Sequence, residues 1–385
     1  MISKTKYLLI SVSLFLFFSC STTRNITDRT SIDQEKFPTN EITIIAVGDN
    51  LIHIDLIKSA KDENTNLYSF DQYYTESEIA SVIQNADIAF INQETLTAGE
   101  EFGYSGYPAF NGPKDIADTL VRLGFDVVNH ATNHSMDKGE RALFEDMKNW
   151  EKYQDVKVLG VYASQDERDN KKNIITKNNI TVGFLSYTYG LNGISLPKDK
   201  PYLVSLIDKK IMDKEITELR PLCDVLVVSM HWGNEYEHIP SKTQEDLATF
   251  LADHNVDLVI GHHPHVLQPA RYISRKDGGT MLCFFSLGNF LSSQRENYTL
   301  LGGMMFVTIK KEDNSIIFNN AELIPLVTHY TRDKKIFRVY LLSEYTHDLA
   351  LKHGAANSKN TINPEYFDTL VKTVFKNGLD IKNEN

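Results

Sequence analysis

The sequence predicts an α/β fold in which sheet strands alternate along the chain with covering helices. Short apolar runs recur from about residue 42, and stretches with helical spacing of apolar residues separate them. The apolar runs are nearly continuous rather than alternating, which is typical of strands covered on both faces. With 385 residues, 42% of them hydrophobic and 24% charged, the chain is long enough for one large domain with a full core.

The order of these elements defines the expected sheet core. Helices are expected where polar faces accompany spaced apolar residues, and successive strands without a long helix between them are expected after residue 300. The expected strands are residues 42–47, 87–91, 125–128, 156–161, 180–185, 225–229, 256–260, 282–285, 304–309, 316–326 and 337–342. The expected helices are residues 76–85, 113–123, 139–153, 243–254 and 362–375. The late strands are expected to add an antiparallel portion to the sheet.

The N-terminus has the proportions of a signal peptide. Lys4 and Lys6 precede an almost wholly apolar run, Tyr7–Phe18, which is too short for a comfortable membrane span. The following Cys20 makes the segment resemble a bacterial lipoprotein signal, with Phe17-Phe18-Ser19-Cys20 as the lipobox. This resemblance implies a cleaved signal over residues 1–19 and lipid attachment to Cys20, whereas the alternative is an uncleaved anchor. Either form predicts a membrane-anchored protein of the bacterial cell envelope whose domain lies outside the cytoplasm.

Residues 20–40 are rich in Ser, Thr, Asn and Asp and predict a flexible tether. We expect the main domain at residues 41–330 and a C-terminal extension packed on it at residues 331–385. Cys223 and Cys283 each lie in or beside an apolar run, which favours buried free thiols, although an exported protein could pair them.

The net charge of −11 argues against a nucleic-acid-binding surface. Loss of the two lysines in the signal would leave 38 basic residues against 51 acidic ones, a net charge of −13. An acidic, phosphorylated or polyanionic substrate would therefore need locally placed cations, which bound metal ions can supply.

The run Gly261-His262-His263-Pro264-His265 is the strongest local signal for chemistry. It follows the apolar segment of residues 256–260, so three imidazoles stand where a strand ends. Histidine both binds divalent metals and moves protons near neutral pH. Pro264 fixes its own φ and pushes His263 toward an extended conformation. A polar turn is the alternative, but three histidines in four positions favour a metal or catalytic site.

Metal-ligand residue types follow several other expected strands. Because sites in open α/β sheets form at the carboxyl ends of strands, we expect these side chains to meet in one crevice. They are Asp49, Glu94, Asn133, His134, His231, His263 and His265. Carboxylate, amide and imidazole ligands suit Zn, Mn or Fe rather than metals that prefer thiolates, and two ions would account for so many ligands.

Six short segments in order resemble the CapA/PgsA capsule synthesis family, a branch of the calcineurin-like metallophosphoesterase superfamily. They cover about residues 42–292. They are Val47-Gly48-Asp49, Asn92-Gln93-Glu94, Asn133-His134-Ser135-Met136-Asp137-Lys138-Gly139, His231-Trp232-Gly233, His263-Pro264-His265-Val266-Leu267-Gln268 and Ser286-Leu287-Gly288-Asn289-Phe290. The resemblance implies a four-layer α/β/β/α sandwich, with two mixed sheets flanked by helices.

The resemblance also implies roles for individual residues. Asp49, Glu94, Asn133, His231, His263 and His265 correspond to metal ligands, and His134 to the histidine that assists the leaving group. Glu94 stands where the superfamily usually has a shorter bridging aspartate. The superfamily's first segment is Asp-x-His, but here Asp49-Asn50-Leu51 lacks that histidine, and His53 is nearby at the wrong spacing.

Other residues have two interpretations each. Asp137 either orients His134 or caps the following helix. Trp232 either forms a binding wall or packs in the core, and His53 and Asn289 are candidates to line the crevice.

The resemblance implies a role in making or exporting poly-γ-glutamate capsule at the membrane. One hypothesis is a hydrolase that uses two divalent ions, Mn, Zn or Fe, on a phosphoester or an amide, with His134 and Asp137 as its catalytic pair. The other is a component without catalysis that binds an anionic polymer through metals, or serves as a scaffold. The expected partners are the membrane through the lipid anchor, capsule synthase or export membrane proteins, and an anionic polymer or phosphorylated substrate, but no nucleic acid.

Overall fold

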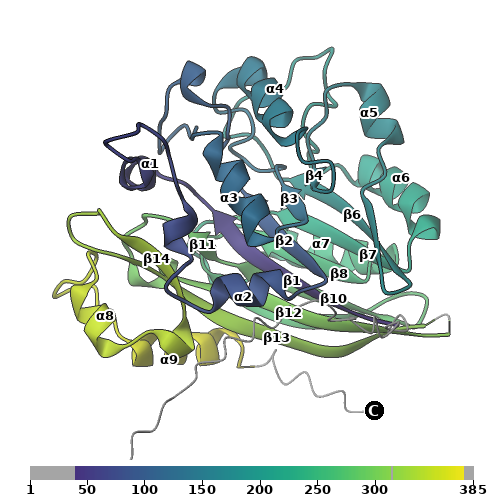
Figure 1. Cartoon of the computed structure of the whole chain (residues 1–385). Helices are drawn as coiled ribbons and strands as arrows, with labels where there is room; N and C mark the ends of the chain where they lie inside the picture. The colour runs from purple at the N-terminus through teal and green to yellow at the C-terminus, as the bar shows by residue number, and fades with distance from the viewer. Residues whose placement is uncertain (1–39, 314, 377–385) are drawn as a thin grey trace, which may run out of the picture. The chain divides into compact units, whose positions relative to one another are not determined.

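Two mixed β-sheets pack face to face, and helices cover their outer faces (Figure 1). This computed structural model describes residues 40–313 and 315–376. The prediction of two mixed sheets flanked by helices in an α/β fold is confirmed. Residues 1–39, which include the expected signal and Cys20, lie outside the described part of the chain.

The first sheet runs in the order β14-β13-β12-β1-β2-β3-β4, and β11 pairs with β1 off this path. Its parallel half contains the strands β1 (Glu41–Asn50), β2 (Ile88–Gln93), β3 (Val127–Asn129), β4 (Lys157–Leu159) and β11 (Asn289–Leu291). Its antiparallel half contains β12 (Leu301–Glu312), β13 (Ser315–Tyr330) and β14 (Phe337–Leu341). Through β14, the C-terminal part of the chain contributes a strand to this sheet.

The second sheet runs in the order β5-β6-β7-β8-β10-β9. Four neighbouring strands, β6, β7, β8 and β10, are parallel, and an antiparallel strand closes each edge. The bounds are β5 (Ile174–Lys177), β6 (Ile180–Thr188), β7 (Val225–His231), β8 (Leu258–His262), β9 (Leu267–Ser274) and β10 (Thr280–Leu287).

The side chains of strand β7 pack alternately into two hydrophobic cores, one on each face of the second sheet. Val225 and Val227 join the core shared with the first sheet, whereas Leu226 and Val228 join the core under α6 and α7. Side chains alternate along a strand, so a strand covered on both faces is apolar throughout. The helices are α1 (Ile54–Ala60), α2 (Ile79–Gln84), α3 (Asp115–Leu123), α4 (Gly139–Trp150), α5 (Gln165–Asn170), α6 (Lys209–Leu219), α7 (Lys242–Asp253), α8 (His347–Lys352) and α9 (Pro364–Val374).

The expected elements did not include helices α1, α5, α6 and α8 or strands β5, β9 and β11. In α6, Met212, Ile216 and Leu219 are buried at helical spacing, and Asp208 caps its first turn. Lysines and acids surround these few apolar residues, so the periodic signal is weak. Strand β11 has three residues, too few to show a period.

Gly48 allows the close approach that positions the next residue, Asp49. An added Cβ at Gly48 would lie 1.9 Å from the carbonyl oxygen of Gly288, so only glycine fits. That same oxygen accepts a hydrogen bond from the Asp49 backbone N–H at 2.9 Å. Gly288 has φ +64°, which glycine adopts without strain. The junction of β10 and β11 thereby fixes the end of β1.

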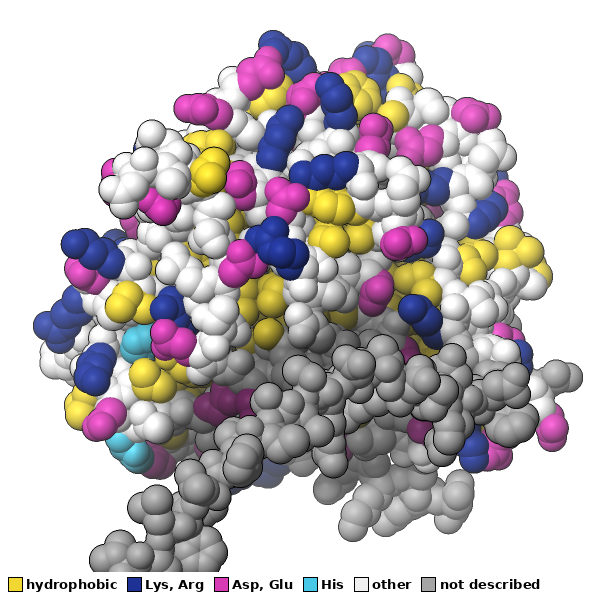
Figure 2. Space-filling view, viewed as in Figure 1, with side chains coloured by type: hydrophobic (Ala, Val, Ile, Leu, Met, Phe, Trp, Pro, Cys, Tyr) yellow, Lys and Arg dark blue, Asp and Glu magenta, His cyan; other side chains and the backbone are white. Residues whose placement is uncertain are grey.

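Within the described ranges, no helix combines the length and apolar character needed to cross a bilayer. Cys223 and Cys283 are both free thiols. On the face drawn in Figure 2, lysines and arginines are interspersed with acidic side chains.

Candidate metal centre

The ends of strands from both sheets bring five predicted ligands together. Asp49 lies at the end of β1 and Glu94 directly follows β2, both in the first sheet. From the second sheet come His231, the last residue of β7, and the pair His263 and His265 in the loop after β8. None of the five is more than 3% exposed. The site therefore lies at the carboxyl ends of parallel strands, where the sequence predicts it.

Three groups of side chains have the spacing to hold a metal ion. They are Asp49, Glu94 and His265; Glu94, His231 and His263; and Glu235, His263 and His265, with ligand atoms within 4.8 Å of one another in each. Each pair of groups shares one residue, so the three groups form a closed ring. Glu94, His263 and His265 are the shared residues. A ring of overlapping groups suits adjacent ions with bridging ligands.

Asp49 and His265 form a buried ion pair. The Nδ1 atom of His265 lies 2.9 Å from Oδ2 of Asp49, and Nδ2 of Asn92 donates to the other carboxylate oxygen at 2.8 Å. Burial alone would raise the pKa of Asp49, but the hydrogen bond and charge of His265 lower it. Burial alone would lower the pKa of His265, but the charges of Glu94 and Asp49 raise it to about 9. Asp49 is therefore held as a carboxylate, the form that binds metal.

Glu94 is a buried carboxylate without hydrogen bonds. Neither of its oxygens has a donor in the described residues, and its Oε1 lies 3.6 Å from Nε2 of His231 and 4.0 Å from Nε2 of His265. Burial, followed by the negative charge of Asp49, raises the pKa of Glu94 well above its ordinary value, although the charge of His265 opposes this. A buried carboxylate of this kind is costly unless a cation compensates it. These orphaned oxygens fit a divalent ion.

His231 and His263 are held as neutral imidazoles. Burial, reinforced by the neighbouring histidines, lowers the pKa of His231 well below its ordinary value and that of His263 to about 3. The Nδ1 atoms of both rings have no hydrogen-bond partner within the described chain. Neutral imidazole is the form that ligates metal, so these atoms also fit a metal ion.

Asn133 and His134 follow β3 in a turn that leads into α4. The Oδ1 atom of Asn133 lies 2.8 Å from Nε2 of His231, so the amide oxygen points at the imidazole cluster. The Nε2 atom of His134 lies 3.9 Å from Oε1 of Glu94. Asn133 and His134, which begin the third of the six segments, are therefore both at the site.

Asp137 contacts His134 rather than capping the next helix. Its Oδ2 lies 2.7 Å from Nδ1 of His134 and also accepts the Phe110 backbone N–H at 2.6 Å. The helix α4 begins at Gly139, and its cap residue, Lys138, makes no side-chain capping bond. Of the two interpretations of Asp137, the geometry matches the one in which it orients His134.

The three candidates for lining the crevice occupy different positions. His53 lies beside the site with its ring 5.2 Å from that of Phe110, but it belongs to none of the three groups. Asn289 is buried and pairs with Asp49 across β11 and β1. Trp232 points away from the imidazoles into the core behind the second sheet, where its Nε1 donates to the Phe285 carbonyl. Neighbouring residues alternate faces, so Trp232 cannot share the face of His231.

Several site residues were not singled out from the sequence. Glu235 follows His231 by four residues, and a carboxylate soon after a strand-end histidine was the available signal. Asn92 precedes Glu94 and holds Asp49. The ring of Tyr189 lies 4.6 Å from that of His263, and no local pattern marks it. His262, excluded from the ligand set, is buried with its ring stacked on Phe90.

The loop that carries the imidazoles has an unusual backbone. His263 has φ +96°, so the prediction that Pro264 gives it an extended conformation is wrong. His265 has φ +58°, and side-chain-bearing residues rarely adopt such positive values. Across from them, Tyr236 has φ +66°. Backbone strain of this kind persists where the surrounding structure fixes it and often accompanies functional sites.

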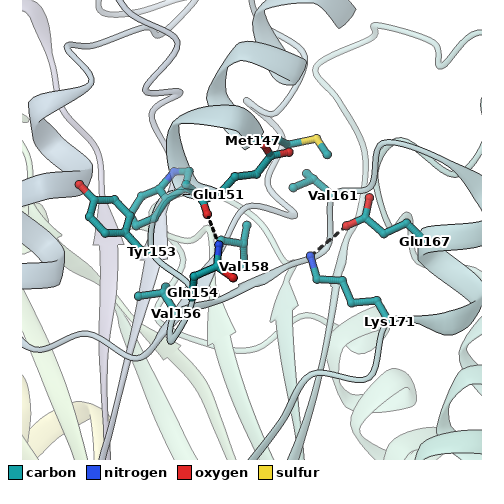
Figure 3. Close-up of a pocket in the computed structure, with 10 residues that line it drawn as sticks. Met147, Glu151, Tyr153, Gln154, Val156, Val158, Val161, Glu167 and Lys171 are labelled. Carbon is teal, nitrogen blue, oxygen red and sulfur yellow. Dashed lines mark hydrogen bonds and ion pairs between the residues drawn. The ribbon is translucent and has the colours of Figure 1, made fainter.

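A pocket elsewhere in the structure is separate from this centre. Figure 3 shows a pocket between the end of α4 and helix α5, with the ion pair of Lys171 and Glu167 at one side. None of the residues that line it belongs to the three metal-site groups. This pocket is therefore not part of the candidate metal centre.

A family model described as bacterial capsule synthesis protein PGA_cap matches residues 43–294, about two thirds of the chain. The chain belongs to this family. The matched range holds all the predicted metal ligands and the pair His134 and Asp137.

Two curated relatives carry related descriptions. The PGA biosynthesis protein CapA of Bacillus subtilis (strain 168) is 28% identical over 264 residues, which cover 67% of this chain and 66% of the relative. The capsule biosynthesis protein CapA of Bacillus anthracis is 34% identical over 188 residues, 47% of this chain and 43% of the relative. The matches thus span less than two thirds of either relative.

Among solved structures, the NAD nucleotidase (NadN) of Haemophilus influenzae matches with a TM-score of 0.48 and 12% identity, over 74% of this PGA_cap chain and 56% of the nucleotidase. The calcineurin-like phosphoesterase YfkN from Bacillus subtilis matches with a TM-score of 0.41 and 16% identity, over 74% of this chain and 90% of that one.

Proposed function

We propose that this PGA_cap protein is a metal-dependent hydrolase that acts on a phosphoester or an amide during the biosynthesis or export of an envelope polymer. The observation that carries the proposal is the ring of carboxylates and imidazoles in which both Glu94 oxygens and the Nδ1 atoms of His231 and His263 are buried without hydrogen-bond partners in the described chain. Structural ion pairs in a core normally satisfy their polar atoms, whereas these atoms are left for a ligand.

Asp49, Glu94, His231, His263 and His265 would hold the divalent ions, with the Asn133 amide oxygen beside them. Such ions, when bound, supply Lewis acidity toward a phosphoryl or carbonyl oxygen and make water more acidic. Oxygen and imidazole ligands suit Mn, Zn or Fe.

His134 is the proton-transfer group of this proposal. Its Nδ1 faces Asp137, which fixes the ring and leaves Nε2 directed toward the Glu94 side of the centre. A protonated Nε2 can give its proton to the departing oxygen or nitrogen, and the Asp137 carboxylate stabilises the imidazolium before the transfer.

The test is hydrolysis of a chromogenic phosphodiester, and separately of a γ-linked glutamate oligomer, by the full chain in detergent with added Mn²⁺. We expect one of the two to be hydrolysed and the His134→Ala variant to lower kcat by about 10²- to 10⁴-fold, the usual contribution of a positioned acid. The metal content of that variant should stay at the wild-type level. Wild-type protein that holds metal but hydrolyses neither compound would contradict a hydrolase of these two classes.

A second candidate function, binding of an anionic polymer without catalysis, is favoured by a cationic cavity of about 560 Å³. Four cations, Arg295, Arg332, Lys334 and Lys359, line it together with one acidic residue, Glu296. Arg295 lies six residues after Asn289, the strand partner of Asp49. A cavity with this excess of positive charge would suit a polymer of carboxylates. Retained polymer binding in His134→Ala, with no hydrolysis by the wild type, would support this function.

Export and lipid anchoring at Cys20 are part of the proposal, supported by the N-terminal sequence alone. We expect radiolabelled palmitate to be incorporated into the wild type in a bacterial host and not into Cys20→Ser. Membrane synthase or export proteins are the proposed partners, and co-purification from crosslinked membranes tests them.

A further inference from the structure

The loop after β7 brings an exposed carboxylate to the mouth of the candidate metal centre. A carboxylate oxygen of Glu235 lies within 4.8 Å of ligand nitrogens of His263 and His265. In the three metal-site groups, Glu235 is the exposed member and the others are buried. It therefore approaches the imidazoles from the solvent side.

Backbone hydrogen bonds fasten this loop to the imidazole loop on both sides of Glu235. The Trp232 N–H donates to the His262 carbonyl at 3.1 Å, and the Tyr236 N–H donates to the Pro264 carbonyl at 2.8 Å. Gly233, with φ +92°, supplies the turn between them. The two loops are thus held side by side, and the position of Glu235 follows from this double attachment.

The end of β1 lacks the imidazole that the superfamily's Asp-x-His segment has there. The position two residues after Asp49 is Leu51, a buried aliphatic side chain that cannot coordinate a metal. The Nδ1 atom of nearby His53 faces the Leu51 carbonyl at 2.9 Å, and this ring belongs to none of the three groups. The end of β1 therefore contributes one ligand, Asp49, where an aspartate and an imidazole would otherwise stand.

We propose that Glu235 is a metal ligand that completes the coordination of the ion held by His263 and His265, in place of the imidazole missing from the end of β1. This inference rests on the metal centre of the proposed function and adds one residue to it. An oxygen ligand in this position favours a hard or borderline divalent ion such as Mn²⁺. As the exposed ligand, it closes the centre toward solvent.

The test is titration of metal-free full chain with Mn²⁺ by calorimetry, and with Co²⁺ by visible absorption, for the wild type, Glu235→Gln and Glu237→Gln. Glu237 is the matched control, since it is an exposed glutamate two residues further along the same loop and lies in none of the three groups. We expect Glu235→Gln to weaken one of two ions at least about tenfold and to change the Co²⁺ spectrum. Glu237→Gln should match the wild type.

Wild-type affinity, stoichiometry and Co²⁺ spectrum in Glu235→Gln would overturn the inference and leave the proposed metal centre intact. A wild type that binds neither ion would overturn both. Equal weakening in Glu235→Gln and Glu237→Gln would also overturn it, because a general charge effect would then explain the loss. Thermal melts of the metal-free variants check that each is folded. We expect wild-type melting, because both substituted positions are exposed.

Discussion

Buried histidines occur in two regions of this molecule, and their ring nitrogens have different surroundings. At the strand ends, the Nδ1 atoms of His231 and His263 have no partner in the described chain, and both residues belong to a metal-site group with Glu94. In the C-terminal region, Nε2 of His353 donates to the Thr328 carbonyl at 3.1 Å and its Nδ1 accepts the Ala355 N–H at 3.0 Å. Both environments lower the histidine pKa through burial, to about 3 for His263 and about 4 for His353.

A lowered pKa alone therefore does not distinguish a ligand from a structural histidine. Between His263 and His353 the distinction lies in hydrogen bonding, because His353 uses both ring nitrogens within the fold and His263 keeps Nδ1 available. The His265→Ala and His353→Gln variants test this division between ligand and structural histidines.

Loss of a strand-end imidazole should have the largest effect. His265 belongs to two of the three groups, so His265→Ala should lower metal affinity about 100-fold or more, beyond the 10- to 100-fold typical of residues that merely support a ligand. Elemental analysis after gel filtration measures the loss. The control is His353→Gln, which should keep the wild-type metal content. Equal losses in both variants would remove the distinction.

The pH dependence of stability should report His353. Its folded pKa, about 4, lies below the ordinary value of about 6.5, so the unfolded state binds a proton first as the pH falls. The two states do not differ in this group above pH 6.5, and stability is lost between pH 6.5 and 4. We expect a contribution of about 2 kcal/mol to the loss between pH 7.5 and 5.

His353→Gln keeps an amide donor for Thr328 but cannot titrate. Urea unfolding at the two pH values should therefore show a smaller drop for this variant than for the wild type. An unchanged drop would mean that His353 is not the titrating group. His329, whose pKa burial and the charge of His353 lower to about 3, would then be tested in the same way.

The smallest effect is expected at Asp137. Asp137→Asn keeps the size of the side chain but removes the charge that faces Nδ1 of His134. We expect kcat for whichever of the two test compounds the wild type hydrolyses to fall about tenfold, less than in His134→Ala, with unchanged metal content. A change in stability with an unchanged kcat would indicate a purely structural role.

The sequence predicted much of the sheet core because apolar runs are a strong local signal. It also predicted which strand-end residues come together, since parallel strands of one sheet end at the same edge. The contact of Glu235 with the imidazoles was not predictable, because it depends on two loops joined by backbone hydrogen bonds. To predict which way the Trp232 side chain points, one must know which residues of β7 face the other sheet. An uninterrupted apolar run does not reveal this.

The metal centre, whose residue Asp49 is positioned by the contact of Gly48 with Gly288, has a consequence for how the protein unfolds. Asp49 and Glu94 lie at strand ends of the first sheet, and the imidazole ligands lie at strand ends of the second, so an ion at this centre would hold the two sheets together. A ligand that binds the folded state alone, at 100 times its Kd, adds about 2.7 kcal/mol to stability. Removal of the metal by a chelator would then weaken the contact between the two sheets. We expect a protease to cut first beside that contact rather than in the outer helices.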